Sequence, residues 1–122
     1  MDKRISEAEL EIMEALWRRA PRTAAEVAED VSADKGWSLQ TVKTMLTRLH
    51  DKGAVDHVTE GRRFLYSPLV ARKDYVKSES QRFVDRLFGG KVMPLVAHLA
   101  ERDALSDDDI AEIEQLIRDL KS

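Results

Sequence analysis

The sequence predicts a mainly α-helical chain with one small β-hairpin, arranged in two parts. Apolar residues recur at helical spacing in several separate segments. Two short β-prone runs, residues 54–58 and 63–68, flank a turn that contains Gly61. Everything after residue 70 is helical in pattern. We therefore expect one domain over residues 1–70 and a helical arm over residues 71–122.

The composition excludes several classes of protein. The chain has 122 residues and no cysteine, which rules out disulfides, thiolate metal sites and cysteine nucleophiles. Its start has no apolar run typical of a signal peptide, and its longest mostly apolar stretch, residues 92–100, is shorter than the about 20 residues that a spanning helix needs. We expect a cytoplasmic protein without membrane insertion. No catalytic or cofactor-binding motif is present, so we expect neither an enzyme nor a cofactor.

The charge is distributed unevenly along the chain. The formal net charge is −3, but residues 35–63 hold six Lys/Arg against three Asp/Glu. Residues 35–50 contain no acidic residue at all. Because charges beyond a Debye length of about 8–10 Å are screened, this local excess of cations decides whether phosphates are attracted, and the net charge does not.

Capping residues mark the first two helices. Ser6 with Glu9, and Thr23 with Glu26, have the spacing of a capping box. Apolar residues then recur on one face of each helix: Leu10, Met13, Leu16 and Trp17, then Val27, Ala28 and Val31. Both segments therefore predict short amphipathic helices.

The third helix is the most informative segment. We expect it from Leu39 to Lys52, with Ser38 as its N-cap and Gly53 at its end. The apolar stripe expected to enter the core consists of Leu39, Val42, Met45, Leu46 and Leu49. The polar residues of the opposite face and flank are Gln40, Thr41, Lys43, Thr44, Thr47, Arg48 and Lys52.

Three short helices followed by a hairpin is the order of a winged helix-turn-helix domain, whose third helix enters the DNA major groove. That groove is about 12 Å wide and admits one helix with its side chains. A helix in this position needs an apolar stripe toward the core and a polar face without acids toward the DNA. The third helix meets both conditions.

The predicted DNA contacts follow from these positions. The polar side chains of the exposed face, Lys43 included, read base edges. The flanking cations Arg48 and Lys52 and the helix N-terminus hold phosphates. Two arginines at the hairpin tip contact phosphate or the minor groove. The predicted DNA-binding residues are Ser38, Gln40, Thr41, Lys43, Thr44, Thr47, Arg48, Lys52, Arg62 and Arg63.

Plainer alternatives stay open at this point. A polar helix face with a few cations is common on any solvated helix, and the arginines at the tip could simply keep the hairpin soluble. A rival function is a winged-helix module that binds a protein without reading DNA, because a fold does not determine a function.

The arm after residue 70 is expected to contain three helices. Asp74 is expected to cap the first, Pro94 lies near the first turn of the second, and Ser106 with Asp109 forms a capping-box variant at the start of the third. A segment of about 50 residues rarely buries strong apolar faces by itself. We therefore expect a second copy of the chain to cover them. The expected interface residues are Val84, Leu87, Phe88, Leu95, Leu99, Ile113, Leu116, Ile117 and Leu120. The alternative is that they fold back onto residues 1–70.

No metal site is expected. His50, His57 and His98 are scattered and show no metal-ligand spacing, so each is expected to be a surface or packing residue. The acidic run at residues 107–109 lacks the spacing of a calcium loop, and its place in the first turn of a helix suits the helix dipole.

Several segments of the chain also carry a family resemblance: residues 5–13, 16–17, 37–49, 52–54 and 60–66. The most specific is TVKTMLTRL at residues 41–49, followed by KGA. Together they resemble the penicillinase-repressor family of BlaI/MecI-type winged-helix repressors, which are related to CopY-type repressors. The resemblance implies a homodimer that binds a palindromic operator, often built around TACA and TGTA halves, and represses nearby genes such as those for β-lactam resistance or other stress responses.

The resemblance also bears on how repression ends. In the penicillinase-repressor branch, a membrane sensor-protease system cleaves the repressor at an Asn-Phe bond. That bond aligns with His98-Leu99 here, so this sequence departs from the family's residues at the possible cleavage site. CopY-type members sense metal through Cys-x-Cys pairs, which a chain without cysteine cannot supply.

Overall fold

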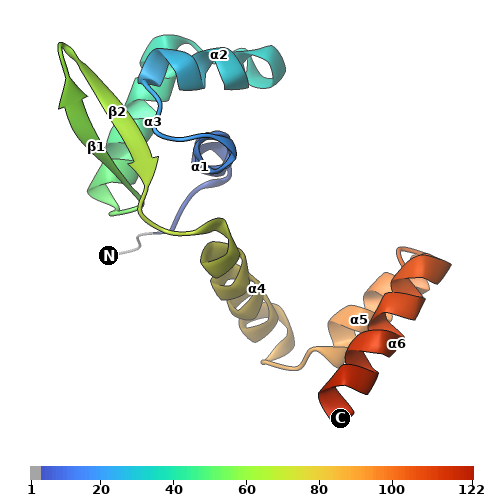
Figure 1. The fold of residues 1–122 in the computed structure, drawn as a ribbon. Helices are drawn as coiled ribbons and strands as arrows, with labels where there is room; N and C mark the ends of the chain where they lie inside the picture. Colours follow the sequence, from blue (N-terminus) through green and yellow to red (C-terminus); the bar gives the residue numbers. More distant parts are fainter. Residues whose placement is uncertain (1–3) are drawn as a thin grey trace. The chain divides into compact units, whose positions relative to one another are not determined.

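The chain runs through three helices, a two-stranded hairpin and three further helices, as the sequence predicts (Figure 1). The computed structural model describes residues 4–122; residues 1–3 of the expected first domain lie outside the described part. The elements are α1 (Glu7–Arg18), α2 (Ala24–Lys35), α3 (Leu39–Asp51), β1 (Val55–Glu60), β2 (Arg63–Pro68), α4 (Arg72–Phe88), α5 (Met93–Glu101) and α6 (Asp107–Lys121).

The chain divides into two compact units, Met1–Val76 and Lys77–Ser122. The division falls a little after the boundary expected at residue 70. The first turn of α4 belongs to the first unit because it contacts α1. The Arg72 guanidinium pairs with Glu14 at 2.7 Å. The indole of Trp17 donates a hydrogen bond of 2.9 Å to the Val70 carbonyl.

Capping residues start the helices of the first unit. The hydroxyls of Ser6 and Thr23 each accept from a backbone amide three residues on, and each capping box is complete. Ser38 caps α3 by accepting from the Thr41 amide at 3.1 Å. Gly53 follows α3 with φ at 80°, a left-handed conformation that glycine adopts without a Cβ clash.

The core of the first unit lies among α1, α2, α3 and the base of the hairpin (Figure 1). Trp17 and Trp37 pack against it as partly buried side chains. The largest fully buried side chains are Ile12, Met13, Leu16, Val27, Val42, Leu46, Leu49 and Val55. The prediction for Leu39 is wrong. This side chain is 41% exposed because the first turn of α3 lies at the edge of the core, where Leu39 lines an open groove.

The hairpin is longer than its sequence suggests. β1 and β2 pair in antiparallel register up to Glu60↔Arg63, so the turn consists of Gly61 and Arg62 alone. Gly61 has φ at 64°, which a tight turn requires and which glycine adopts readily. The shorter turn places both arginines of the tip at the end of a continuous two-stranded ribbon.

A third segment joins the hairpin, although no pattern in the sequence predicts it. Arg22, in the connection between α1 and α2, pairs with Tyr66 of β2 through two main-chain hydrogen bonds. The Arg22 amide donates to the Tyr66 carbonyl at 3.0 Å, and the Tyr66 amide donates back at 2.8 Å. This single-residue bridge carries no sequence pattern because it needs no strand-like alternation.

The second unit starts its helices largely as predicted. Ser106 and Asp109 form a complete capping box at α6, and Pro94 lies in the first turn of α5. The prediction for Asp74 is wrong: α4 begins at Arg72, so Asp74 lies inside its first turn.

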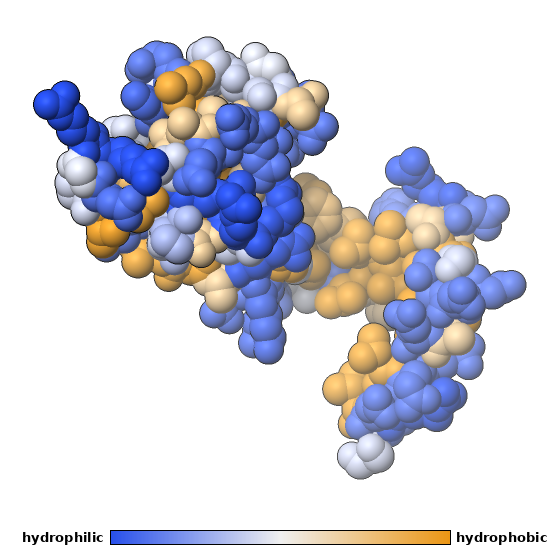
Figure 2. All heavy atoms as spheres, turned by 45° about the horizontal axis from the view of Figure 1, so that its top comes forward, coloured by the Kyte–Doolittle hydropathy of each residue, from blue (hydrophilic) through white to orange (hydrophobic). Residues whose placement is uncertain are grey.

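The second unit has almost no buried core. Of the hydrophobic side chains described for residues 77–122, Val84 alone is buried. Many others remain in contact with solvent, and Figure 2 shows hydrophobic side chains open on the surface of these helices. The strongly exposed ones are Phe83, Leu87, Val92, Met93, Leu99, Ile110, Leu116, Ile117 and Leu120. In residues 4–122 we find no helix both long and apolar enough to cross a membrane.

Candidate nucleic-acid interface

The outer face of α3 is polar and free of acids, as predicted. Val42, Met45, Leu46 and Leu49 are buried on the inner face. The remaining predicted contacts between residues 38 and 48 are exposed: Ser38, Gln40, Thr41, Lys43, Thr44, Thr47 and Arg48. The only acidic residue of α3 is its last, Asp51. This face has the width of one helix and carries positive charge, which suits the major groove.

Two threonines on this face have restricted hydrogen-bonding capacity. The Thr44 hydroxyl donates to the Gln40 carbonyl and the Thr47 hydroxyl to the Lys43 carbonyl, both at 3.0 Å. With its proton used inside the helix, each hydroxyl can still accept a hydrogen bond, and each methyl group stays outside. The structure therefore favours contact with a thymine methyl or with a donor on a base edge.

The N-terminus of α3 is organised by Ser38 and Thr41. The Ser38 hydroxyl donates to the Thr41 hydroxyl at 3.1 Å while accepting from the Thr41 amide. No acidic residue lies in the first turn. The positive end of the helix dipole is thus left uncompensated by the helix itself, which favours a phosphate there.

Three of the predicted DNA-binding cations are available. The side chains of Lys43, Arg48 and Arg62 are exposed, and within residues 4–122 they form no ion pair or hydrogen bond. A cation that is not neutralised by the protein can replace the counterions of DNA.

Arg63, the other arginine of the hairpin tip, is partly engaged. Its guanidinium pairs with Glu60 at 2.7 Å, although the side chain is largely exposed. The hydrogen bond and the charge of Glu60 raise the pKa of Arg63 above its ordinary value. An exposed pair of this kind is weak and exchanges with solvent, so it leaves the Arg63 guanidinium only somewhat less available to a phosphate than that of Arg62.

Lys52 has a different place from the one predicted. Its ammonium pairs with the buried carboxylate of Glu9 and donates to the Arg4 carbonyl at 2.8 Å. Burial raises the pKa of Glu9, but hydrogen bonds from Lys52 and Ser6 outweigh it, so the pKa is lowered on balance. Lys52 therefore fastens the end of α3 to the start of α1, and its charge is used inside the protein.

Two histidines and two aromatic rings dock the hairpin on the end of α3. His50 stacks on His57 with ring centroids 4.6 Å apart, and His57 stacks on Phe64 at 4.1 Å. Tyr66 meets His57 edge-on. His50 and His57 are packing residues, as expected, but they are not scattered. Within the described part of the chain no group of three metal-ligating residues is present.

Arg22 holds the segment that bridges to the hairpin. Its buried side chain donates to the Arg19 carbonyl at 2.8 Å, to Asp30 at 3.0 Å and to the Ala15 carbonyl. Hydrogen bonds from Arg18 and Arg22 hold the pKa of Asp30 below its ordinary value. The network connects the end of α1, the middle of α2 and the strand β2. No pattern in the local sequence predicts it.

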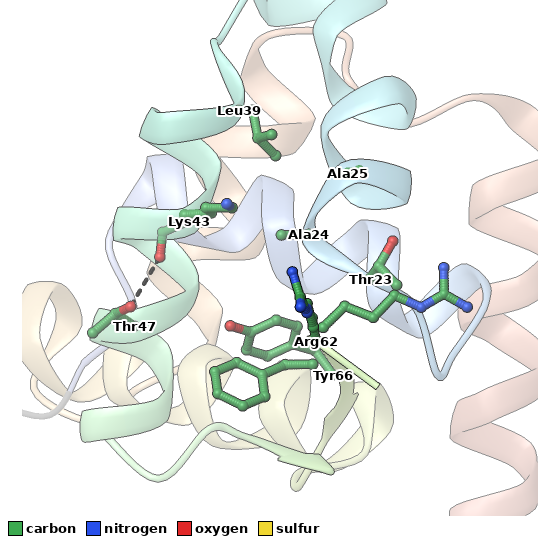
Figure 3. Close-up of a pocket in the computed structure, with 10 residues that line it drawn as sticks. Thr23, Ala24, Ala25, Leu39, Lys43, Thr47, Arg62 and Tyr66 are labelled. Atoms are coloured by element: carbon green, nitrogen blue, oxygen red, sulfur yellow. Dashed lines mark hydrogen bonds between the residues drawn. The ribbon is translucent and has the colours of Figure 1, made fainter. Parts of the chain in front are cut away.

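A groove of about 450 Å³ runs between α2, α3 and the hairpin (Figure 3). α3 contributes Lys43 and Thr47 to its wall, and the hairpin contributes Arg62. The complete lining is Thr23, Ala24, Ala25, Leu39, Lys43, Thr47, Arg62, Arg63, Phe64 and Tyr66. The groove therefore connects the two elements that are predicted to touch DNA.

Three helices, a hairpin docked on the third of them and an acid-free exposed helix face define a winged-helix DNA-binding protein. A family model described as penicillinase repressor matches residues 5–119. The chain belongs to the penicillinase repressor family and is a DNA-binding transcriptional repressor.

The relatives agree with this assignment. A penicillinase repressor from Bacillus licheniformis is 37% identical over 118 residues, which are 97% of this chain and 92% of that one. The solution structure of the DNA-binding domain of the repressor BlaI is 42% identical, with a TM-score of 0.55 over 60% of this chain and 89% of that one. Monomeric Bacillus licheniformis BlaI in complex with the blaP half-operator is 43% identical, with a TM-score of 0.51 over 59% of this chain and 88% of that one.

Proposed function

We propose that the chain acts in the cytoplasm as a homodimer, binds a palindromic operator and represses nearby genes by blocking RNA polymerase. Its action is binding, without catalysis. The observation that carries the proposal is the exposed, acid-free face of α3, flanked by the unpaired cations Lys43, Arg48 and Arg62. The BlaI half-operator complex supports DNA as the partner, because that related domain is 43% identical.

Each subunit would place α3 in the major groove of one half-site. Gln40, Thr44 and Thr47 would face base edges, and the cations would neutralise phosphates on both sides. The hairpin tip would reach the adjacent backbone through Arg62. Lys52 has no part in this interface, because Glu9 already holds it.

The open apolar surface of the second unit supports the homodimer. Val84 is buried, Phe88, Leu95 and Ile113 are half-buried, and the other predicted interface residues are exposed. In a helical unit with one buried apolar side chain, apolar burial is too small to offset the conformational entropy lost on folding. A second copy of the same surface would cover it in a two-fold arrangement, which matches a palindromic operator.

The test is fluorescence anisotropy of the full chain on the DNA upstream of its own gene and on a scrambled duplex of the same composition. We expect a dissociation constant of about 10⁻⁸ M or tighter for the operator at moderate salt. Arg62→Ala should weaken binding to both duplexes and flatten the salt dependence, whereas Gln40→Ala should change sequence preference. Equal, salt-insensitive affinity for both duplexes would favour the rival, a winged-helix module that binds protein.

A sensor-linked protease is the finer proposal for release. The His98–Leu99 bond lies inside α5, and the His98 side chain is largely exposed. Helical backbone must unwind locally before a protease can bind it as an extended chain. We expect a cut between these residues in cells exposed to a β-lactam, detected by the masses of the two fragments; an intact chain in derepressed cells would refute it.

A further inference from the structure

The groove between α2, α3 and the hairpin has the size of a small-molecule site. It measures about 450 Å³, within the range of about 300–1,000 Å³ that such sites occupy. Its lining mixes apolar surface with a few polar groups, which is also typical of ligand pockets. The apolar members of the lining are Ala24, Ala25, Leu39, Phe64 and Tyr66.

Three of these side chains remain in contact with solvent: Ala25, Leu39 and Phe64. Leu39 is 41% exposed and Phe64 is 44% exposed. The apolar stripe of α3 would place Leu39 in the core, yet it lies on the groove wall (Figure 3). Covering these side chains with another apolar surface is favourable, because it removes them from water.

All the charged groups of the groove are cations. Lys43, Arg62 and Arg63 line it, and no Asp or Glu does. Glu60 already pairs with Arg63, but Lys43 and Arg62 form no ion pair within residues 4–122. Thr23 and Thr47 have their hydroxyl protons engaged elsewhere. The strongest groups offered to a ligand are therefore two unpaired positive charges.

We propose that this groove binds a small carboxylate with a flat apolar body. The body lies against Leu39 and Phe64, and the carboxylate lies between Lys43 and Arg62. A bare phosphate would use the charges alone and leave the apolar wall uncovered, so the lining favours the amphipathic anion. Because Lys43 and Arg62 are also proposed DNA contacts, the ligand competes with the operator and acts as an inducer. The competition rests on the proposed function, whereas the binding does not.

The binding experiment uses the full chain without DNA. 2-Naphthoate is the probe, and neutral 2-naphthamide, of the same shape, is its control. We expect a dissociation constant in the millimolar range or tighter for a ligand of this size. Amide shifts in an NMR titration should concentrate at residues 23–25, 39–47 and 62–66. Lys43→Met should weaken 2-naphthoate binding about fivefold or more, whereas Arg48→Gln, a cation of the same helix outside the groove, should not change it.

Three results of this titration would overturn the site. The first is no binding of 2-naphthoate. The second is equal binding of 2-naphthamide, which would mean that the cations play no part. The third is equally tight binding of inorganic phosphate at the same residues, which would mean a plain anion site. Leu39→Ser isolates the contribution of the apolar wall, because it should weaken 2-naphthoate binding without changing the binding of phosphate.

The competition experiment adds 2-naphthoate to the chain bound to a fluorescent operator duplex. We expect the apparent dissociation constant for the duplex to rise with ligand concentration, and 2-naphthamide to leave it unchanged. Binding without displacement would overturn the inducer role and the DNA contacts of Lys43 and Arg62. Tight operator binding by a chain that does not bind 2-naphthoate would overturn the groove site alone. Failure of the groove site and failure of the proposed function are therefore distinguishable.

Discussion

At the residue scale, the role of Lys52 is decided by one contact. On the sequence it is a cation at the flank of the third helix and a candidate phosphate contact. In the structure its ammonium pairs with Glu9, which is buried. Removing one member of such a pair leaves the other charged group buried and unpaired, and that costs more than an exposed ion pair contributes.

We expect Lys52→Met to lower the free energy of unfolding by about 1–3 kcal/mol at pH 7. Lys52 holds the pKa of Glu9 below its ordinary value, so the contribution of the pair is present above that value and is lost as the pH falls through the lowered pKa. The difference between the two proteins should therefore shrink in acid. Urea denaturation at several pH values measures it.

Lys43→Met is the matched control, because Lys43 is exposed and unpaired. We expect it to change stability by less than about 0.5 kcal/mol but to weaken DNA binding. Unchanged stability of Lys52→Met, together with a flatter salt dependence on DNA, would instead restore Lys52 as a phosphate contact.

At the scale of elements, the hairpin depends on a residue outside it. Arg22 pairs with Tyr66 through the main chain while its side chain holds α1 and α2. The stacked rings of His50, His57 and Phe64 hold the hairpin against α3 at the same level, because His57 lies opposite Tyr66 in the hairpin. The angle between the hairpin and α3 is thus set by contacts on both strands.

We expect Arg22→Met to loosen this attachment and to reduce the contribution of the hairpin tip to DNA binding. A double-mutant cycle measures it. The loss caused by Arg62→Ala should be smaller in the Arg22→Met background, although the two side chains form no hydrogen bond with each other. The loss caused by Arg48→Ala on α3 should be the same in both backgrounds. Strict additivity for Arg62 would show that Arg22 does not position the hairpin.

At the scale of the whole molecule, the two units have different sources of stability. The first has a contiguous core of buried side chains from three helices and the hairpin. The second buries Val84 and leaves most of its apolar side chains open. We therefore expect its stability to depend on association and on protein concentration.

We expect Ile117→Asp to abolish the dimer, because Ile117 lies on the open apolar face of α6 and a charge there cannot be covered without large cost. Sedimentation should show a monomer. Affinity for a half-site should stay, while affinity for the full operator falls by about tenfold or more, as joint binding is lost. Gln115→Asp adds the same charge to the same helix outside the apolar stripe and should keep the dimer. A dimer that survives Ile117→Asp would contradict the proposed interface.

The sequence by itself determined the local structure: the capping boxes at Ser6, Thr23 and Ser106, the end of α3 before Gly53, and the acid-free face of the third helix. These features depend on residues a few positions apart, and at that range the spacing in the sequence determines how the residues lie in space.

Tertiary structure decided which cations are free, where Leu39 lies and what holds the hairpin. Lys52 meets Glu9 across 43 positions, and Arg22 in the α1–α2 connection meets Tyr66 of β2. Such contacts depend on how the elements pack, and no periodic pattern in a chain encodes which distant residue will lie opposite.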